Sequence, residues 1–288
     1  MKIFVCNKLY NFYCIYSKEI NFIFNNTNFN TNNFNEADYM ITCLSDERNY
    51  PVYGNMPYAE PKINIENINV FLNKHFKLNS FQKIVIFYHT PVVFCNNVIN
   101  VCYSKDDNDN HNIVICPPSI QKYSFNNEIN KKYFLSFKGN ILCSEKRKNI
   151  FLNFHKYNNS KNIVITKKNN SYQYDDLITN SLFSIIIEGD LPWSYRLTEA
   201  INAGSIPIII KPKNKNILAF SELIDYSLFS IVIEPEEIDN LMCNILPNMS
   251  TEKIQSMLLE LENVNNRFFI SRKQQMYGVL EILQKRLL

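Results

Sequence analysis

Short apolar segments alternate with polar, turn-rich segments along most of the chain. The apolar segments are rich in Ile, Val, Phe and Tyr, which is typical of buried β-strands. In the first part of the chain they predict strands over residues 2–5, 20–24, 39–44, 83–88, 98–102 and 112–115. Apolar residues at helical spacing predict one helix over residues 65–76. Residues 25–35 and 104–111 lack such a period and are predicted to be loops.

A second series of strands and helices begins after Pro117 and Pro118. It predicts strands over residues 131–139, 162–166, 182–187, 206–210 and 229–233, with helices starting after Ser144, near 174–180, over 194–203 and from 236 onward. Continuous apolar strands are typical of a parallel sheet that is covered on both faces. The pattern therefore predicts an α/β fold of two doubly wound, Rossmann-like lobes with a cleft between them. We expect an N-terminal lobe over residues 1–128 and a C-terminal lobe over residues 129–288.

Composition excludes several classes of protein. A net charge of +3 on 34.0 kDa is mild, so we expect no nucleic-acid partner. No stretch approaches the roughly 18 uncharged apolar residues of a membrane span, so none is expected. The 8 cysteines form no CxxC pair, which favours buried thiols in a reducing compartment. The bias toward Asn, Ile and Lys indicates an AT-rich genome, either microbial or that of a large virus.

Few motifs for metal or cofactor binding are present. Five glycines cannot build a nicotinamide fingerprint or a P-loop here. The acidic run at residues 106–110 lacks the Gly and Glu of a calcium loop, so we interpret it as a solvated loop. The four histidines are not spaced as a metal cluster.

Residues 175–234 carry the strongest local pattern. They contain the only Trp and two of the five glycines in a chain that otherwise avoids glycine. The strand over 182–187 leads through a turn to Ser194, which is expected to cap a helix. Gly204 is expected to end that helix, and Pro207 lies at the start of the next strand.

This pattern has two interpretations. It places backbone N–H groups, the positive end of a helix dipole and Arg196 at the carboxyl edge of a parallel sheet, where α/β folds bind phosphorylated ligands. Alternatively, it is an ordinary strand–turn–helix unit, with Arg196 and Glu199 as an exposed pair on the helix surface. The residues alone leave both interpretations open.

The same region resembles a known family. The sequence GDLPWSYRLTEAINAGSIPIII at residues 189–210 resembles the signature of the exostosin glycosyltransferases (glycosyltransferase family 47). LAFSELIDYSLFSIVIEPEEI at 218–238, YFLSFKGN at 133–140 with the following Arg147, and DDLITNSLFSI at 175–185 are similar to other family segments. ADYMITCLSD at 37–46 resembles an N-terminal strand of the family more faintly. The resemblance covers about residues 131–245.

The resemblance implies a glycosyltransferase of the GT-B type with a trimmed N-terminal acceptor lobe. It implies inverting transfer of a sugar from a nucleotide donor, UDP-linked, to a glycan hydroxyl. Ser194, Tyr195 and Arg196 would line the donor diphosphate beside Gly189, and Glu199 would accept the ribose hydroxyls. The other side of the donor site would be closed by Lys138, Gly139 and Arg147.

The sequence departs from the family at Glu188, because the family usually carries Arg before the Gly of this loop. An acidic residue beside a diphosphate weakens binding unless it points away or pairs with a lysine. Lys211, Lys213 and Lys215 are candidates for compensation from the next loop, or they form a solvated basic loop. Glu188 therefore bears on both the identity of the donor and activity itself.

No Asp-x-Asp motif follows a strand outside the loop 104–111, so we expect neither a metal ion nor a cofactor. An inverting transfer needs a general base for the acceptor hydroxyl. Three residues at predicted strand ends or in the donor loop are candidates for that base, with a structural role as the alternative for each: His89, Asp46 and Asp190.

The sequence is also compatible with two other functions. One is a catalytically silent, exostosin-like partner in a homo- or hetero-dimer, which Glu188 would suit. The other is a glycan-binding module that does not bind nucleotide. In each case we expect a protein of the cytoplasm, the host cytoplasm if the source is a virus.

Overall fold

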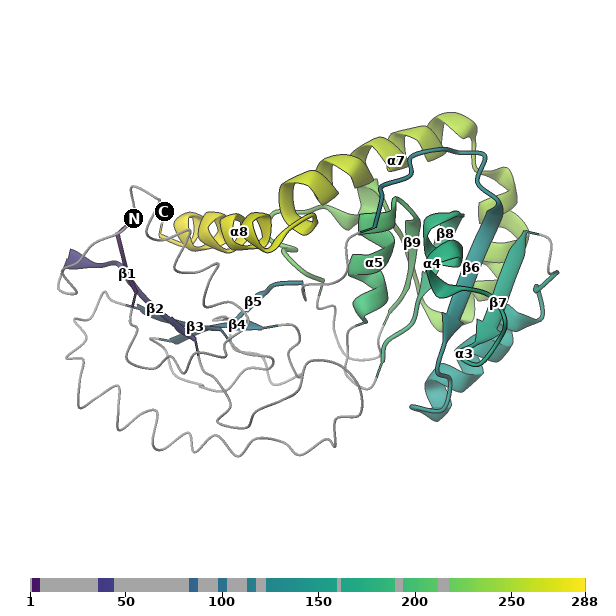
Figure 1. The fold of residues 1–288 in the computed structure, drawn as a ribbon, viewed down its shortest axis with the longest axis horizontal. Helices are drawn as coiled ribbons and strands as arrows, with labels where there is room; N and C mark the ends of the chain where they lie inside the picture. Colours follow the sequence, from purple (N-terminus) through teal and green to yellow (C-terminus); the bar gives the residue numbers. More distant parts are fainter. Residues whose placement is uncertain are drawn as a thin grey trace. The chain divides into compact units, whose positions relative to one another are not determined.

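The computed structural model describes residues 2–5, 36–43, 83–87, 98–102, 113–117, 123–159, 162–189, 194–211 and 218–287. The chain forms two compact units: Met1–Cys116 together with Val279–Leu288, and Pro117–Gly278 (Figure 1). The change of unit thus follows Cys116, whereas the boundary predicted from the sequence lies after residue 128. The predicted strand 20–24, the helix 65–76 and the loops 25–35 and 104–111 lie outside the described residues.

The first unit contains a five-stranded parallel sheet. Its strands follow chain order: β1 (Ile3–Val5), β2 (Tyr39–Cys43), β3 (Lys83–Phe87), β4 (Val98–Cys102) and β5 (Ile113–Ile115). Each strand matches a predicted one to within a residue at either end. Tyr39, on β2, is fully buried, and its hydroxyl donates to the carbonyl of Leu283 at 3.0 Å. This bond links the sheet to the chain's last helix within the same unit.

The second unit contains another five-stranded parallel sheet, in the order β10-β9-β8-β6-β7. Its strands are β6 (Tyr133–Gly139), β7 (Ile163–Lys167), β8 (Ser181–Ile186), β9 (Ile206–Ile210) and β10 (Ile231–Ile233). Three helices connect the first four strands: α3 (Glu145–His155), α4 (Tyr174–Thr179) and α5 (Tyr195–Ala203). Numbered within the unit, the strand order is 2-1-3-4-5, a doubly wound arrangement. The prediction of α/β structure with parallel sheets is confirmed.

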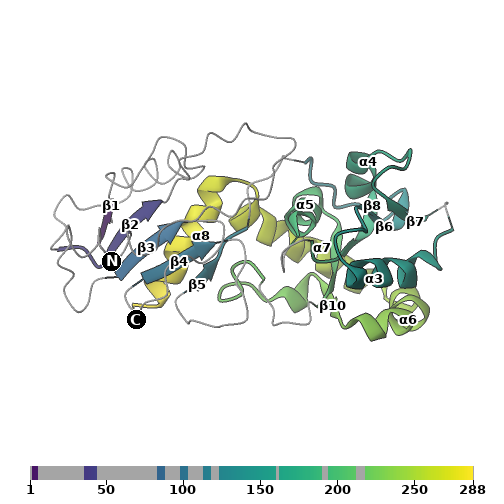
Figure 2. The same ribbon diagram turned by 90° about the horizontal axis from the view of Figure 1, so that it is seen from below.

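Helices cover both faces of the second sheet. α4 packs beside α5 on one face, and α3 packs beside α6 (Ile238–Asn240) on the other (Figure 2). Every residue of β8 and β9 is buried, because these central strands have helices on both faces. This burial accounts for the continuous apolar sequences of the two strands. It leaves the ends of the strands as the places where polar side chains can gather.

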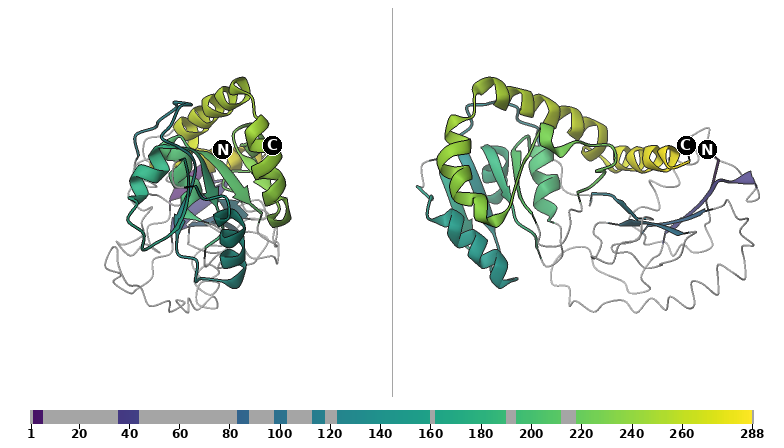
Figure 3. Two further views of the ribbon diagram at one scale, coloured as in Figure 1. Left: turned by 90° about the vertical axis from the view of Figure 1, so that its right-hand side faces the viewer. Right: turned by 180° about the vertical axis from the view of Figure 1, so that it is seen from behind.

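The chain ends in a run of helical segments. After β10 come η4 (Pro235–Glu237), α6, a π-helical turn η5 (Leu241–Ile245) and η6 (Leu246–Asn248). They are followed by α7 (Thr251–Val264), the turn η7 (Asn265–Phe269) and α8 (Arg272–Lys285), drawn in yellow-green and yellow in Figure 3. The prediction of helices from about residue 236 to the end is confirmed. Within the described part of the chain, none of the helices combines the length and the apolar character needed to cross a membrane.

Candidate functional site

The site lies where the connections of the second sheet change direction. β6 and β8 are parallel neighbours, but the chain leaves β6 toward β7 and leaves β8 toward β9, on opposite sides. In open α/β sheets, the crevice outside the carboxyl ends of two such strands is the usual place for a ligand. The helices α3 and α5 follow these two strands, so both helices begin at this edge of the sheet.

The two helices begin with the same capping arrangement. Ser144 accepts a hydrogen bond from the Arg147 backbone N–H at 3.1 Å, and Ser194 accepts one from the Arg196 backbone N–H at 3.3 Å. Both caps have extended backbone, as an N-cap requires. Gly204 ends α5 with a φ of 76°, so both predicted ends of this helix are confirmed. The caps place an arginine in the first turn of each helix.

Arg147 is 2% exposed, and backbone oxygens surround its guanidinium group. Its Nε donates to the carbonyl of Asn140 at 2.6 Å, and its Nη1 donates to the carbonyl of Ile187 at 2.9 Å and to that of Glu188. Arg147 therefore ties the turn after β6 to the loop after β8. A buried guanidinium with carbonyl partners holds these two segments in register and brings positive charge beneath the site.

Arg196 is half-buried and reaches across to β6. Its Nε and Nη2 donate to the carbonyl of Lys138 at 3.1 and 3.0 Å. Its Cζ lies 5.3 Å from the centre of the Phe137 ring, and the Cζ of Arg147 lies 5.5 Å from the same centre. Both guanidinium groups therefore converge on the last residues of β6.

Gly139 makes this convergence possible. A Cβ atom at this position would lie 2.6 Å from Nη2 of Arg196 and 3.1 Å from Nη2 of Arg147. Any larger residue would displace at least the Arg196 guanidinium. The structure therefore brings Gly139, Arg147 and Arg196 together, as the sequence analysis expected of one site.

Lys138 faces the neighbouring strand end. Its ammonium group donates to the carbonyl of Asn170 at 3.0 Å and to that of Tyr172, both after β7. Its backbone carbonyl, by contrast, receives the two bonds from Arg196. In this structure Lys138 contributes to the site through its backbone.

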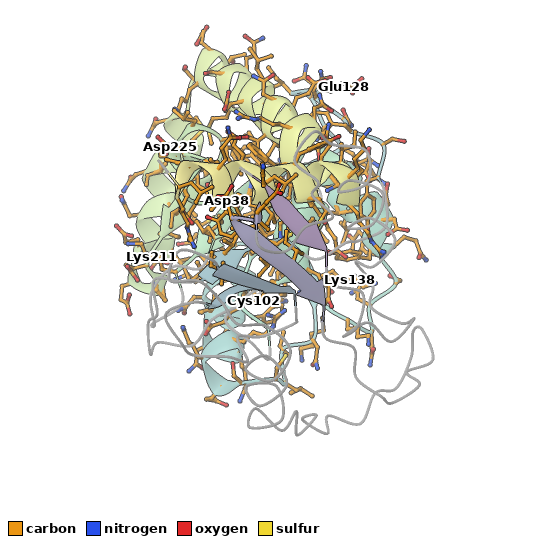
Figure 4. The ribbon with its side chains drawn as sticks, turned by 90° about the vertical axis from the view of Figure 1, so that its left-hand side faces the viewer. Asp38, Cys102, Glu128, Lys138, Lys211 and Asp225 are labelled. Carbon is orange, nitrogen blue, oxygen red and sulfur yellow. The ribbon has the colours of Figure 1, made fainter. Side chains whose placement is uncertain are left out.

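Glu188 pairs with Lys146, which is not one of the three predicted candidates for compensation. Its Oε1 lies 2.7 Å from Nζ of Lys146, in the first turn of α3, and both side chains are about one-quarter exposed or less. Lys211, the described candidate for compensation, pairs with Glu234 at 3.0 Å. Figure 4 shows Lys211 and Lys138 far apart in the view, as expected for strands separated by β8. Lys213 and Lys215 lie outside the described residues.

Glu199 and Arg196 bond to different partners. The hydroxyl of Tyr174, at the start of α4, donates to Oε2 of Glu199. Burial raises the pKa of Glu199, while the Tyr174 hydroxyl and the Arg196 charge act in the opposite direction. Arg196 is oriented toward β6, so the exposed Arg196–Glu199 surface pair is not what the structure contains.

Several predicted residues cannot be compared with the structure. Ser194, Tyr195, Arg196 and Gly189 are described at this edge of the sheet, but Asp190, His89 and Asp46 lie outside the described residues. Where the structure describes the chain, it contains no group of three His, Cys, Asp or Glu side chains arranged for a metal ion. Among the described residues, the charged groups at the site include those of Arg147, Arg196, Glu199 and the Lys146–Glu188 pair.

Three contributing residues were not predicted: Phe137, Lys146 and Tyr174. Phe137 could have been found, because it lies two residues before Gly139 on one strand and so shares its face. Lys146 and Tyr174 meet partners 42 and 25 residues away in the sequence, and no local pattern signals such contacts.

Comparison with known proteins gives one family match. The family model for the Exostosin GT47 domain matches residues 105–249, half of the chain. A search of curated proteins finds no match.

Solved structures with a similar arrangement include TarM, with a TM-score of 0.41 and 7% identity, over 85% of this chain and 54% of that one. The pneumococcal O-GlcNAc transferase GtfA, in complex with UDP and GlcNAc, has a TM-score of 0.41 and 11% identity, over 70% and 53%. WaaG, a glycosyltransferase involved in lipopolysaccharide biosynthesis, has 0.39 and 10%, over 97% and 99%. The chain spans about half the length of the first two proteins.

Proposed function

The chain belongs to the exostosin GT47 family, and we propose that it is a glycosyltransferase. In this proposal it transfers a sugar from a UDP-linked donor to a hydroxyl group of a glycan, with inversion and without a metal ion. The donor occupies the edge of the second sheet at β6 and β8. The two compact units are the two lobes of a GT-B enzyme.

The observation that carries the proposal is the meeting of Arg147 and Arg196 over Gly139. Sugar transfer from UDP-sugar leaves a diphosphate on which negative charge grows, and this charge must be stabilised. The guanidinium group of Arg196 has five N–H donors. The Lys138 carbonyl accepts from the one on Nε and from one of the two on Nη2. Donors on Nη1 and Nη2 remain to bind phosphate oxygens in a half-buried setting, where charge-assisted bonds are strong.

The other residues take supporting roles. The first turn of α5, with Ser194 and Tyr195, offers backbone N–H groups and the positive end of the helix dipole to the diphosphate, beside Gly189. Glu199 accepts the ribose hydroxyls. Arg147 acts through the two segments that it ties together, because its Nε and Nη1 already donate to carbonyl oxygens.

We propose that the transfer needs no metal ion, since two guanidinium groups and two helix N-termini supply positive charge at this edge. The acceptor oxygen attacks the anomeric carbon while a base takes its proton, and the bond from that carbon to the diphosphate breaks, releasing UDP. His89, Asp46 and Asp190 remain the candidates for the base.

Glu188 favours one alternative function, that of a catalytically silent partner subunit, because it brings a negative charge into the donor loop. The ion pair with Lys146, whose Nζ lies 2.7 Å from Oε1 of Glu188, partly neutralises this negative charge. The two functions differ in nucleotide binding, which can be measured directly.

A thermal-shift titration of the whole protein with UDP, GDP and CMP, with and without EDTA, tests the proposal. A ligand that binds only the folded state raises the melting temperature. We expect a rise with UDP that persists in EDTA and that Arg196→Ala abolishes. Arg267→Ala, an exposed arginine of the same unit, is the matched control and should keep the rise. No rise with any nucleotide would overturn the enzyme and support the silent partner, and a rise lost in EDTA would overturn metal independence.

A further inference from the structure

Tyr174 contacts both of the α5 side chains that the proposed function assigns to the donor. Its hydroxyl donates to Oε2 of Glu199. Its ring lies under the guanidinium of Arg196, with Cζ 5.9 Å from the ring centre. Tyr174 is the first residue of α4, so it joins the chain after β7 to the helix after β8.

The electrostatic setting keeps the Tyr174 hydroxyl a donor. Burial and the neighbouring Glu199 carboxylate raise the pKa of Tyr174 well above its ordinary value, so the phenol stays protonated. Among the described residues, Tyr123 and Asp175 are further titratable groups that act on this pair, with the Tyr123 hydroxyl 3.3 Å from Oδ1 of Asp175. Burial raises the pKa of Tyr123, and the negative charges of Glu199 and Asp175 raise it further. The hydrogen bond to Glu199 is therefore present throughout the neutral range.

One oxygen of Glu199 is thus oriented by a fixed donor. An ionised carboxylate has about four lone-pair positions, so the Tyr174 bond leaves acceptor capacity on both oxygens. The 2′ and 3′ hydroxyls of a ribose are two adjacent O–H donors. Both can donate to the Glu199 carboxylate when it is held in one rotamer. Without the phenol, Glu199 could turn toward water and lose this match.

We propose that Tyr174 is a positioning residue that sets the preference of this site for ribonucleotides over nucleotides lacking the ribose hydroxyls. This inference rests on the proposed function and extends it. The hydroxyl of Tyr174 acts on the ribose through Glu199, and its ring acts on the diphosphate through Arg196. The two contributions can be separated, because a phenylalanine keeps the ring and loses only the hydroxyl.

The test measures dissociation constants of the whole protein for UDP, 2′,3′-dideoxy-UDP and uridine. The wild type should prefer UDP to the dideoxy analogue by on the order of tenfold or more, as expected for hydrogen bonds to a charged group. Tyr174→Phe should reduce that preference to roughly two- to threefold, and should leave the preference for UDP over uridine within about twofold of wild type. Tyr174→Leu, which also removes the ring, should reduce both preferences.

Tyr133→Phe is the matched control. The Tyr133 hydroxyl donates to Oδ2 of Asp176 at 2.9 Å, so this bond also joins a tyrosine to a carboxylate, here one on α4. Its loss should lower the melting temperature without changing either preference. If Tyr174→Phe lowers affinity for all three probes equally, or changes none, Tyr174 is only structural and the inference fails while the proposed function stands. If the wild type binds none of the probes, both fail.

Discussion

Gly139 lies where two guanidinium groups approach the backbone of β6. Its conformation is ordinary extended strand, so the reason for glycine is space: a Cβ atom would lie 2.6 Å from Nη2 of Arg196. We expect Gly139→Ala to leave the free energy of unfolding within about 1 kcal/mol of wild type, since a flexible side-chain end can move. UDP affinity should fall by roughly tenfold, or about 1.4 kcal/mol, because the displaced Arg196 guanidinium no longer points toward the diphosphate. Calorimetric titration with UDP and urea unfolding measure the two quantities.

Gly204 supplies the contrasting variant. Its φ of 76° is left-handed, and a Cβ atom there would lie 2.3 Å from the backbone oxygen of Asn126. Gly204→Ala should therefore destabilise the fold by at least about 1–2 kcal/mol while the folded fraction still binds UDP normally. Equal losses of affinity in both variants would show that Gly139→Ala acts through general unfolding.

At the scale of elements, the first turn of α3 holds the end of β8 through two neighbouring residues. Arg147 bonds to the carbonyls of Ile187 and Glu188, and Lys146 pairs with the Glu188 side chain. Reversing one charge of that pair puts like charges about 3 Å apart in a half-buried place, which is unfavourable. We expect Lys146→Glu and Glu188→Lys each to destabilise by roughly 1 kcal/mol, and the double variant to recover most of it.

Urea unfolding and UDP affinity of all four proteins complete this cycle. Reversing the exposed Lys148–Glu145 pair of the same helix is the control and should change little. If the Glu188 side chain pointed toward the diphosphate and did not pair with Lys146, the single variant Glu188→Lys would tighten UDP binding. That result would contradict the structural role given to the pair.

Elements and caps could be predicted because their causes are local. Ser144, Ser194 and Gly204 act within one turn of chain, and the sequence pattern identified all three. The Lys146–Glu188 pair could not be predicted, because the lysines at 211, 213 and 215 are closer to Glu188 along the sequence. Which lysine reaches Glu188 depends on β6 and β8 being neighbours in the sheet. Which strands are neighbours depends on the strand order of the sheet, and the apolar pattern of the sequence does not predict that order.

At the scale of the whole molecule, the pattern predicted two doubly wound α/β lobes, but only the second unit has that strand order among the described strands. One sheet follows chain order, and the other is doubly wound as 2-1-3-4-5. Only the second has a reversal of direction among its described strands, and Arg147 and Arg196 meet at that reversal. The site residues were therefore identified by family resemblance, whereas their convergence depends on a topology that the sequence did not reveal.

The dependence of the free energy of unfolding on pH gives a further prediction. Burial lowers the pKa of Lys131 to about 7, with Glu128 acting in the opposite direction, and its ammonium donates to the Gly204 carbonyl at 2.7 Å. Below pH 7 both folded and unfolded states hold the proton. Between pH 7 and the ordinary value of 10.5, the unfolded state holds more protons, so the free energy of unfolding rises with pH.

Lys131→Met should remove this rise. The difference in unfolding free energy between wild type and variant should grow in favour of wild type from pH 7 to pH 9.5, measured by urea unfolding. Lys132→Met is the matched control: hydrogen bonds to Tyr133 and Asp176 raise the pKa of Lys132, so its contribution is constant below pH 10 and is lost only at higher pH. A flat difference for Lys131→Met would mean that its ammonium is hydrated in the folded protein, and that the end of α5 at Gly204 is open to water.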